Sequence, residues 1–167
     1  MEPKIINKDE MKLIGCVFYG DPFHSVKGWD MGNEIGKLWM RFVKVMDEIR
    51  NQIKNIIVNP NLSYEIHIDP VIGKEEKKCY VFIGVEVKEY KNIPLEMFCK
   101  TLPKTKYAIF TAKGDNFKTA NKFLYNEWLP KSNYKESHSY QIQAYDSKRF
   151  FGMENPDSEV DFYIPIK

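Results

Sequence analysis

Two pairs of segments in this chain carry polar and aromatic side chains at every second position, a pattern suited to binding a small molecule. Because side chains alternate along a β-strand, we expect these positions to share one face of each strand pair. The expected face carries Glu65, His67, Tyr80, Phe82 and Glu86 in the first pair, and Gln141, Gln143, Tyr145, Asp161 and Tyr163 in the second. Aromatic rings beside a few hydrogen-bonding groups are typical of a ligand pocket, whereas a solvated sheet face is the alternative.

The acidic candidates differ in their sequence surroundings. Glu86 lies between Val85 and Val87, where burial disfavours its charge unless a bound cation or a hydrogen-bond donor compensates. It is therefore predicted either to supply a counter-charge in a pocket or to act as a structural carboxylate paired within the protein. Glu65 is the second candidate and lies nearer the start of its strand, where more water is expected.

The aromatic candidates are of two kinds. Tyr145 and Tyr163 are predicted to point away from the helices, where a ring stacks on a ligand and a cation over it gains ~0.5 to 2 kcal/mol. Trp39 falls on the inner stripe of a predicted helix, so it lines either the groove or the core, and Trp128 is assigned to the core. His67 is a titratable residue that would make binding depend on pH, unless it is only a hydrogen-bonded surface residue.

Several kinds of chemistry have no support in the sequence. No Ser, His and Asp set, phosphate loop or metal cluster is recognisable, so no catalytic residue, cofactor or metal is predicted. A net charge of +2 gives no broad reason to expect nucleic acid, and no apolar run is long enough to span a membrane. The isolated Cys16, Cys79 and Cys99 are interpreted as reduced core thiols of a cytoplasmic chain.

The elements that must position these residues follow from hydrophobic periodicity. Residues 12–20 read as a buried strand, and a helix capped by Asn33 follows, with apolar residues three and four positions apart until Ile53. Residues 64–69 and 80–87 then form a hairpin. A shorter helix with Phe117, Ala120, Asn121, Leu124 and Trp128 on its inner face, ended by Pro130, is predicted in the second half.

The order strand, helix, strand, strand occurs twice. The stretch beginning at Lys12 matches the one beginning at Lys106 at an offset of 94, and Tyr64 matches Tyr140 at an offset of 76, which makes His67 the counterpart of Gln143. We therefore predict one α+β domain over residues 1–167, with halves at about 4–90 and 95–167 and a bridging strand at about 96–102. The two units should form a pseudo-twofold sheet with a central ligand groove.

Each helix covers only one face of its sheet, which fixes the expected position of the groove. The apolar set expected beneath the first helix is Tyr64, Ile66, Ile68, Val81, Ile83, Val85 and Val87. The groove is then predicted on the opposite face. Because the repeat begins near residue 4, a helix-turn-helix has no place in this chain, and direct nucleic-acid binding is not expected.

Several short stretches, in this order, resemble the GyrI-like or bacterial effector-binding family of small-molecule-binding domains. They are residues 35–42, 83–87, 102–110, 127–130, 145–146 and 163–166. The resemblance implies a pseudo-twofold fold whose groove binds bulky aromatic cations through stacked rings and an acidic counter-charge. It also implies a relation to multidrug-responsive regulators, although this chain is interpreted as a standalone domain.

The chain departs from that family at one position. In relatives that use an acidic counter-charge, the strand after the second helix resembles the pattern Phe-Glu-x-Tyr-Asp. In this chain the matching residues 142–146 are Ile-Gln-Ala-Tyr-Asp, so the acid is replaced by Gln143. Some members of the family resemble hydrolases in which this acid transfers protons. Gln143 carries no charge and cannot serve as a general base, which weighs against hydrolase activity in this chain.

The expected function is therefore a standalone domain that senses or sequesters a hydrophobic aromatic compound, either cationic or neutral. The alternatives are a hydrolase of electrophilic small molecules, with Glu86 or Glu65 as its acid, and a module that binds a partner protein.

Overall fold

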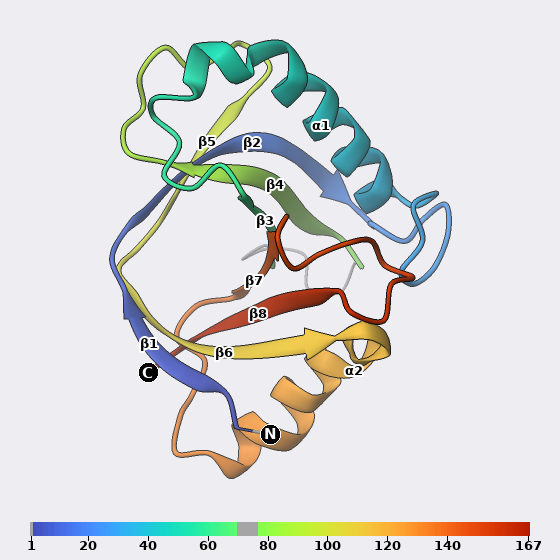
Figure 1. The fold of residues 1–167 in the computed structure, drawn as a ribbon. Coiled ribbons are helices and arrows are strands. Elements are labelled where there is room, and N and C mark those ends of the chain that lie inside the picture. Colours follow the sequence, from blue (N-terminus) through green and yellow to red (C-terminus); the bar gives the residue numbers. More distant parts are fainter. Residues whose placement is uncertain (1, 70–76) are drawn as a thin grey trace.

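The computed structural model describes residues 2–69 and 77–167, and these form an α+β fold built on one antiparallel sheet (Figure 1). The strands are β1 (Lys4–Lys8), β2 (Met11–Gly20), β3 (Leu62–Ile68), β4 (Cys79–Val87), β5 (Phe98–Leu102), β6 (Thr105–Lys113), β7 (Tyr140–Asp146) and β8 (Glu159–Ile166). The helices are α1 (Glu34–Ile53) and α2 (Phe117–Lys122). The predicted fold class is confirmed.

The strand order shows the duplication directly. The sheet runs β1-β6-β8-β7-β3-β4-β2-β5, so β3, β4 and β2 on one side of the centre correspond to β7, β8 and β6 on the other. Ile66 and Ile142 are paired at the centre, and they are separated by the same offset of 76 that the sequence repeat shows. The edge strands are exchanged, because β1 precedes β2 but pairs with β6, while β5 precedes β6 but pairs with β2.

Helix α1 begins and packs as its sequence predicts. The Asn33 side chain accepts a hydrogen bond of 3.0 Å from the Gly36 N–H, which satisfies one of the free donors of the first turn. Leu38, Phe42 and Ile49 are buried against β2 and β4. Figure 1 shows α1 lying over these two strands.

The second helical segment is shorter and less regular. Phe117, Ala120 and Leu124 are buried against β6 and β8, as expected. After α2 the chain widens into π-helical turns over Phe123–Trp128 and then narrows to a 3₁₀ turn over Leu129–Lys131. Trp128 is half-buried beside this cluster, so its predicted place in the core is close to that observed.

The face of the sheet away from the helices is filled by its own core, which we call the closed face. Tyr64, Ile66, Phe82, Tyr107 and Ile142 lie there, fully or almost fully buried. The chain bends that join β1 to β2 and β5 to β6 lie on the left in Figure 1, on the side opposite the loop between β7 and β8. The prediction that this face holds an open groove is wrong.

The register of the hairpin explains this correction. Ile66 is paired with Phe82, and Glu65 with Ile83, so residues of the same parity on β3 and β4 share a face. Tyr64, Ile66 and Ile68 therefore lie away from α1, while only the β4 residues of the predicted apolar set lie beneath it. The hairpin turn falls outside the described residues except at its ends.

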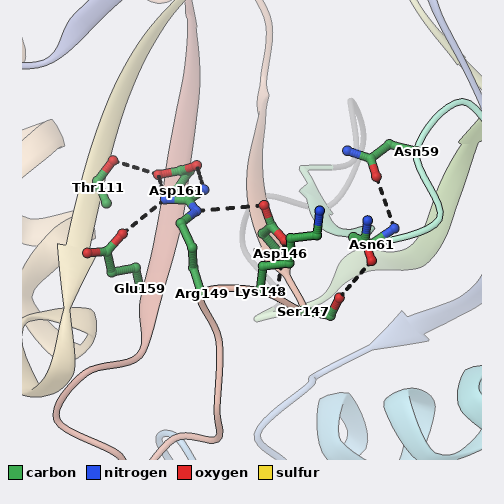
Figure 2. A network of polar contacts seen from close by, with 9 residues as sticks. All are labelled: Asn59, Asn61, Thr111, Asp146, Ser147, Lys148, Arg149, Glu159 and Asp161. Carbon is green, nitrogen blue, oxygen red and sulfur yellow. Dashed lines mark hydrogen bonds and ion pairs between the residues drawn. The ribbon is translucent and has the colours of Figure 1, made fainter.

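The loop between β7 and β8 is tied down by a charged network at its first residues (Figure 2). Arg149 lies 3.1 Å from a carboxylate oxygen of Glu159 and also pairs with Asp146 and Asp161. Ser147 connects this loop to the other half, since its N–H donates to the Asn61 carbonyl at 2.8 Å. These contacts fix the position of residues 150–154, which form one wall of the candidate site.

Candidate functional site

A cavity of about 1180 Å³ lies between the two halves, on the face of the sheet that also carries the helices. We call it the central cavity. One wall comes from α1 and the preceding loop, the other from α2 and the loop between β7 and β8, and β3 and β7 form its floor. Because α1 covers β2 and β4 and α2 covers β6 and β8, the two central strands are left uncovered between them.

The floor consists of four polar side chains arranged around the centre of the sheet. Glu65 is paired with Gln143 and His67 with Gln141, on either side of the Ile66–Ile142 pair. All four line the central cavity. Under the pseudo-twofold relation His67 corresponds to Gln143 and Glu65 to Gln141, so the acid and the histidine of the first half face two amides of the second.

Glu65 is the buried acid of this floor, with 4% of its surface exposed. One carboxylate oxygen accepts a hydrogen bond of 2.6 Å from the Trp39 indole N–H, and the other lies 2.7 Å from His67 Nε2. Burial opposes the charge of His67, but hydrogen bonds to Cys79 and Glu65 and the charges of these groups outweigh it, raising the pKa of His67 to about 9. The imidazole of His67 is therefore protonated at neutral pH.

Aromatic rings stand over this floor. The Trp39 and Tyr145 rings meet edge to face with 5.1 Å between centroids, and Tyr145 meets Phe150 in the same way at 5.0 Å. The Tyr145 hydroxyl donates a hydrogen bond of 2.8 Å to the Gln143 side-chain carbonyl. Burial and the nearby Glu65 charge raise the pKa of Tyr145 well above its ordinary value, so it remains a neutral donor.

The outer lining is apolar and acidic. Met31, Met40 and Met153 contribute flexible thioether side chains, which adapt to ligands of different shape. Four carboxylates line the cavity against one lysine and one histidine: Asp30, Asp47, Glu65 and Glu154, with Lys44 and His67. This balance favours a cationic ligand over an anionic one.

Five of the nine predicted site residues line the central cavity, namely Trp39, Glu65, His67, Gln143 and Tyr145. The other four do not, because the hairpin register and the pairing of β7 with β8 turn them to the opposite side of the sheet. Phe82, Glu86 and Tyr163 lie on the closed face, and half-exposed Tyr80 packs against Tyr19 with 4.5 Å between ring centroids. These four residues therefore do not share a face with Glu65 and His67 as predicted, and their ligand roles stay predictions.

Glu86 illustrates the structural alternative. Its carboxylate lies 3.2 Å from Lys8 Nζ and accepts a hydrogen bond of 3.3 Å from the Tyr64 hydroxyl. These contacts are made on the closed face, where apolar side chains fill the space around the carboxylate and it does not line the central cavity. Glu65, judged the wetter of the two acids from the sequence, is the more deeply buried one.

Three further residues line the central cavity although the sequence analysis does not predict them as ligand-binding residues: Asn121, Trp29 and Phe150. Asn121 was placed on the inner face of the second helix, and its side-chain oxygen is buried with no hydrogen-bond partner, so it is free to accept one from a ligand. Trp29 and Phe150 come from loops, where no periodicity marks them. Trp29 is a large aromatic residue within the irregular stretch 21–30, and that is the signal that could have marked it.

The three cysteines differ in burial. Of the three cysteines predicted in the core, only Cys16 is buried, whereas Cys79 is half-buried and Cys99 is exposed. Within residues 2–69 and 77–167, no group of three or more His, Cys, Asp or Glu side chains is arranged to hold a metal ion. In the same part of the chain, neither helix has the length and apolar content that crossing a membrane requires.

Comparison with known proteins places the fold among effector-binding domains. Residues 4–166 match the Cass2 family, described as integron-associated effector binding protein. The transcriptional regulator BrlR of Pseudomonas aeruginosa is 29% identical over 168 residues, which cover 99% of this chain and 56% of that protein. The chain thus spans little more than half the length of this curated relative.

Solved structures share the fold at low sequence identity. SAV2435, whose structure was determined bound to tetraphenylphosphonium, superposes with a TM-score of 0.72 at 14% identity, covering 100% of this chain and 94% of that one. A hydrolase from Listeria innocua superposes with a TM-score of 0.59 at 10% identity, covering 99% and 92%. At these identities the likeness concerns the fold alone.

Proposed function

We propose that this chain, which belongs to the Cass2 family of integron-associated effector binding proteins, binds a hydrophobic aromatic cation in its central cavity. The observation that carries this proposal is the buried Glu65 carboxylate at the floor, beneath the Trp39 and Tyr145 rings. The ligand would stack on the rings while its charge faces the carboxylate.

The physical argument rests on desolvation. A carboxylate removed from water interacts more strongly with a nearby cation than an exposed one does, because the local dielectric is lower. The floor has already been dehydrated during folding, so a ligand entering the cavity need not displace a full hydration shell from Glu65. Aromatic faces add cation–π attraction of ~0.5 to 2 kcal/mol.

The glutamine at position 143 is compatible with this function. Gln143 and Glu65 are directly opposite each other on β7 and β3, so the acid has the neighbouring position on the same floor. Gln143 keeps a positioning role, since its carbonyl accepts the Tyr145 hydroxyl and so holds that ring upright. The tetraphenylphosphonium bound to SAV2435 further supports an aromatic cation as the first probe.

The test is a titration of tetraphenylphosphonium followed by tryptophan fluorescence and calorimetry, because Trp29 and Trp39 line the cavity. Glu65→Gln is expected to weaken binding roughly 10- to 100-fold, the value of a hydrogen-bonded charge. Glu86→Gln is the matched control, a carboxylate on the adjacent strand and the closed face, and should leave affinity unchanged within twofold.

A neutral analogue separates charge from shape. Triphenylphosphine oxide carries similar rings without a positive charge, so it should bind the wild type more weakly than tetraphenylphosphonium does. Its affinity should be the same for the wild type and for Glu65→Gln. Absence of saturable binding of either compound, or equal weakening by Glu65→Gln and Glu86→Gln, would reject the proposal.

A further inference from the structure

A second, smaller cavity of about 260 Å³ lies between the later turns of α1, the segment that joins α1 to β3, and the sheet. We call it the flank pocket. It adjoins the central cavity, since Trp39 lines both. Its volume is just below the ~300 to 1000 Å³ of pockets that hold drug-sized ligands, so it is suited to a smaller compound.

The floor of the flank pocket is apolar and fixed in position. Four side chains, none more than 8% exposed, form it: Phe42, Met46, Ile57 and Val85. The Trp39 ring stands beside this floor and meets Phe42 edge to face, with 5.9 Å between centroids. Its orientation is set by the hydrogen bond from the indole N–H to Glu65. An aromatic ligand would therefore find apolar and aromatic contacts already in place.

The wall opposite α1 is also held before any ligand arrives. The Val58 N–H donates to the Glu86 carbonyl at 2.9 Å, and the Lys88 N–H donates to the Ile56 carbonyl at 2.8 Å. These bonds attach the segment after α1 to the end of β4. Because the wall is preorganised, binding in the flank pocket need not pay for ordering it.

The rim of the flank pocket is positively charged. Arg50 and Lys54 lie one turn apart on α1 and both line the pocket, whereas none of the described residues that line it is acidic. Arg50 Nη2 is 3.9 Å from Asp47 Oδ1, and both side chains are largely exposed, so this ion pair is weak. Lys54 has no ion-pair partner among residues 2–69 and 77–167. Both cations are therefore available to an anionic ligand.

The end of α1 does not cancel this positive charge. Carbonyl groups at a helix C-terminus repel anions when they lack partners. Here the Arg50 carbonyl accepts a hydrogen bond from the Lys54 N–H at 2.9 Å, and the Ile53 carbonyl accepts one from the Ile57 N–H at 3.3 Å. The flank pocket thus favours a negative ligand, whereas the adjoining central cavity, with four carboxylates, favours a positive one.

We propose that the flank pocket binds a small aromatic carboxylate, with its rings on the apolar floor and its carboxylate between Arg50 and Lys54. The planar guanidinium of Arg50 matches a carboxylate, and the lysine adds a second charge-assisted hydrogen bond. The flexible Met46 side chain adapts the floor to rings of different outline. This site does not depend on cation binding in the central cavity.

The experiment titrates 2-naphthoate into the full chain at pH 7, followed by calorimetry and by the indole N–H resonances of the three tryptophans in ¹H–¹⁵N spectra. Trp39 lines the flank pocket, Trp29 lines only the central cavity, and Trp128 lines neither. Saturation with 2-naphthoate should shift the Trp39 resonance and leave the other two unchanged. The neutral 2-naphthamide should bind roughly tenfold more weakly, because it lacks the charge that faces the two cations.

Two charge variants and one matched control test the rim. Arg50→Gln and Lys54→Gln change exposed side chains, so the fold should be retained, and each should weaken 2-naphthoate binding about threefold. The double variant should weaken it roughly tenfold. Arg41→Gln removes an exposed arginine of the same helix that lines neither cavity, and it should leave the affinity unchanged.

The proposal is overturned if 2-naphthoate shows no saturable binding, or if it binds no more tightly than 2-naphthamide. It is equally overturned if Arg41→Gln weakens binding as much as the double variant, or if Trp29 shifts instead of Trp39, which would place the anion in the central cavity. The double variant should bind tetraphenylphosphonium within twofold of the wild type. Loss of tetraphenylphosphonium binding would leave the 2-naphthoate results unaffected, so failure of the two proposals can be distinguished.

Discussion

The two faces of the central sheet each hold a buried or partly buried glutamate with similar partners, but one face is filled by apolar side chains and the other is open. On the cavity face, Glu65 accepts a hydrogen bond from Trp39 and lies beside His67. On the closed face, Glu86 accepts a hydrogen bond from Tyr64 and lies beside Lys8. On the closed face apolar side chains from both halves fill the space around the pair. On the cavity face about 1180 Å³ remains open above it.

The difference shows what separates a structural carboxylate from one available to a ligand. The lysine beside Glu86 pairs with it on a face that apolar side chains close to ligands. The histidine beside Glu65 can lose its proton, and a cation entering the cavity can take its place. Burial alone does not distinguish the two acids, whereas the partner and the open volume do.

The largest expected effect concerns packing. Phe82→Ala on the closed face removes a ring that is 2% exposed and should lower the free energy of unfolding by about 3 to 5 kcal/mol. Phe150→Ala on the cavity wall should cost less than half as much, because one side of that ring faces the cavity. Urea denaturation measures both, and equal losses would contradict the distinction between the faces.

A second effect follows from the titration of His67. Its pKa is raised to about 9 in the folded protein from the ordinary 6.5, so the charged form stabilises the fold. This contribution is complete below pH 6.5 and is lost as the pH rises through about 9, on the order of 3 kcal/mol in total. Urea denaturation from pH 6 to pH 10 measures it.

His67→Gln should remove this part of the pH dependence of stability. His138→Gln, at an exposed histidine, is the matched control and should behave like the wild type. A His67→Gln profile that falls as steeply as that of the wild type would contradict the assignment.

Ligand binding should depend on the same proton. A cation competes with the His67 charge for Glu65, so tetraphenylphosphonium affinity should rise roughly tenfold from pH 7 to pH 9 as His67 releases its proton. Triphenylphosphine oxide should show no such rise, and His67→Gln should bind the cation equally at both pH values. Calorimetry in buffers of different ionisation enthalpy would detect the released proton.

The smallest effect lies at the closed-face pair. Lys8→Met removes the cation beside Glu86, which should destabilise the fold by roughly 1 kcal/mol because both side chains are only partly exposed. Tetraphenylphosphonium affinity should stay within twofold of the wild type. A larger change in affinity would mean that the two faces are coupled.

Much of the fold could be predicted because its signals are local. The Asn33 cap, the apolar stripe of α1 and the alternation in β3 are properties of neighbouring residues. The duplication was visible as a repeated order of such signals, and the offset of 76 coincides with the central pairing of Ile66 and Ile142. Strand β1 was not predicted, because its pairing with β6 depends on a segment about 100 residues away.

The candidate site was predicted only in part. Alternation correctly grouped Glu65 with His67 and Gln143 with Tyr145, since each pair lies on one strand. It failed where two strands had to be combined, placing Phe82 and Glu86 with Glu65. A shift of one residue in hairpin register exchanges the two faces, and no residue pattern in either strand fixes that choice.

The sequence by itself determined which residues alternate, where the first helix begins and that the chain repeats, because these depend on interactions between near neighbours. The tertiary structure decided which side of the sheet each alternating set faces and which side stays open. That choice depends on strand register and on how widely the two helices are separated, both of which are set by long-range packing. It is why Glu65 faces a cavity while Glu86 is enclosed in a core.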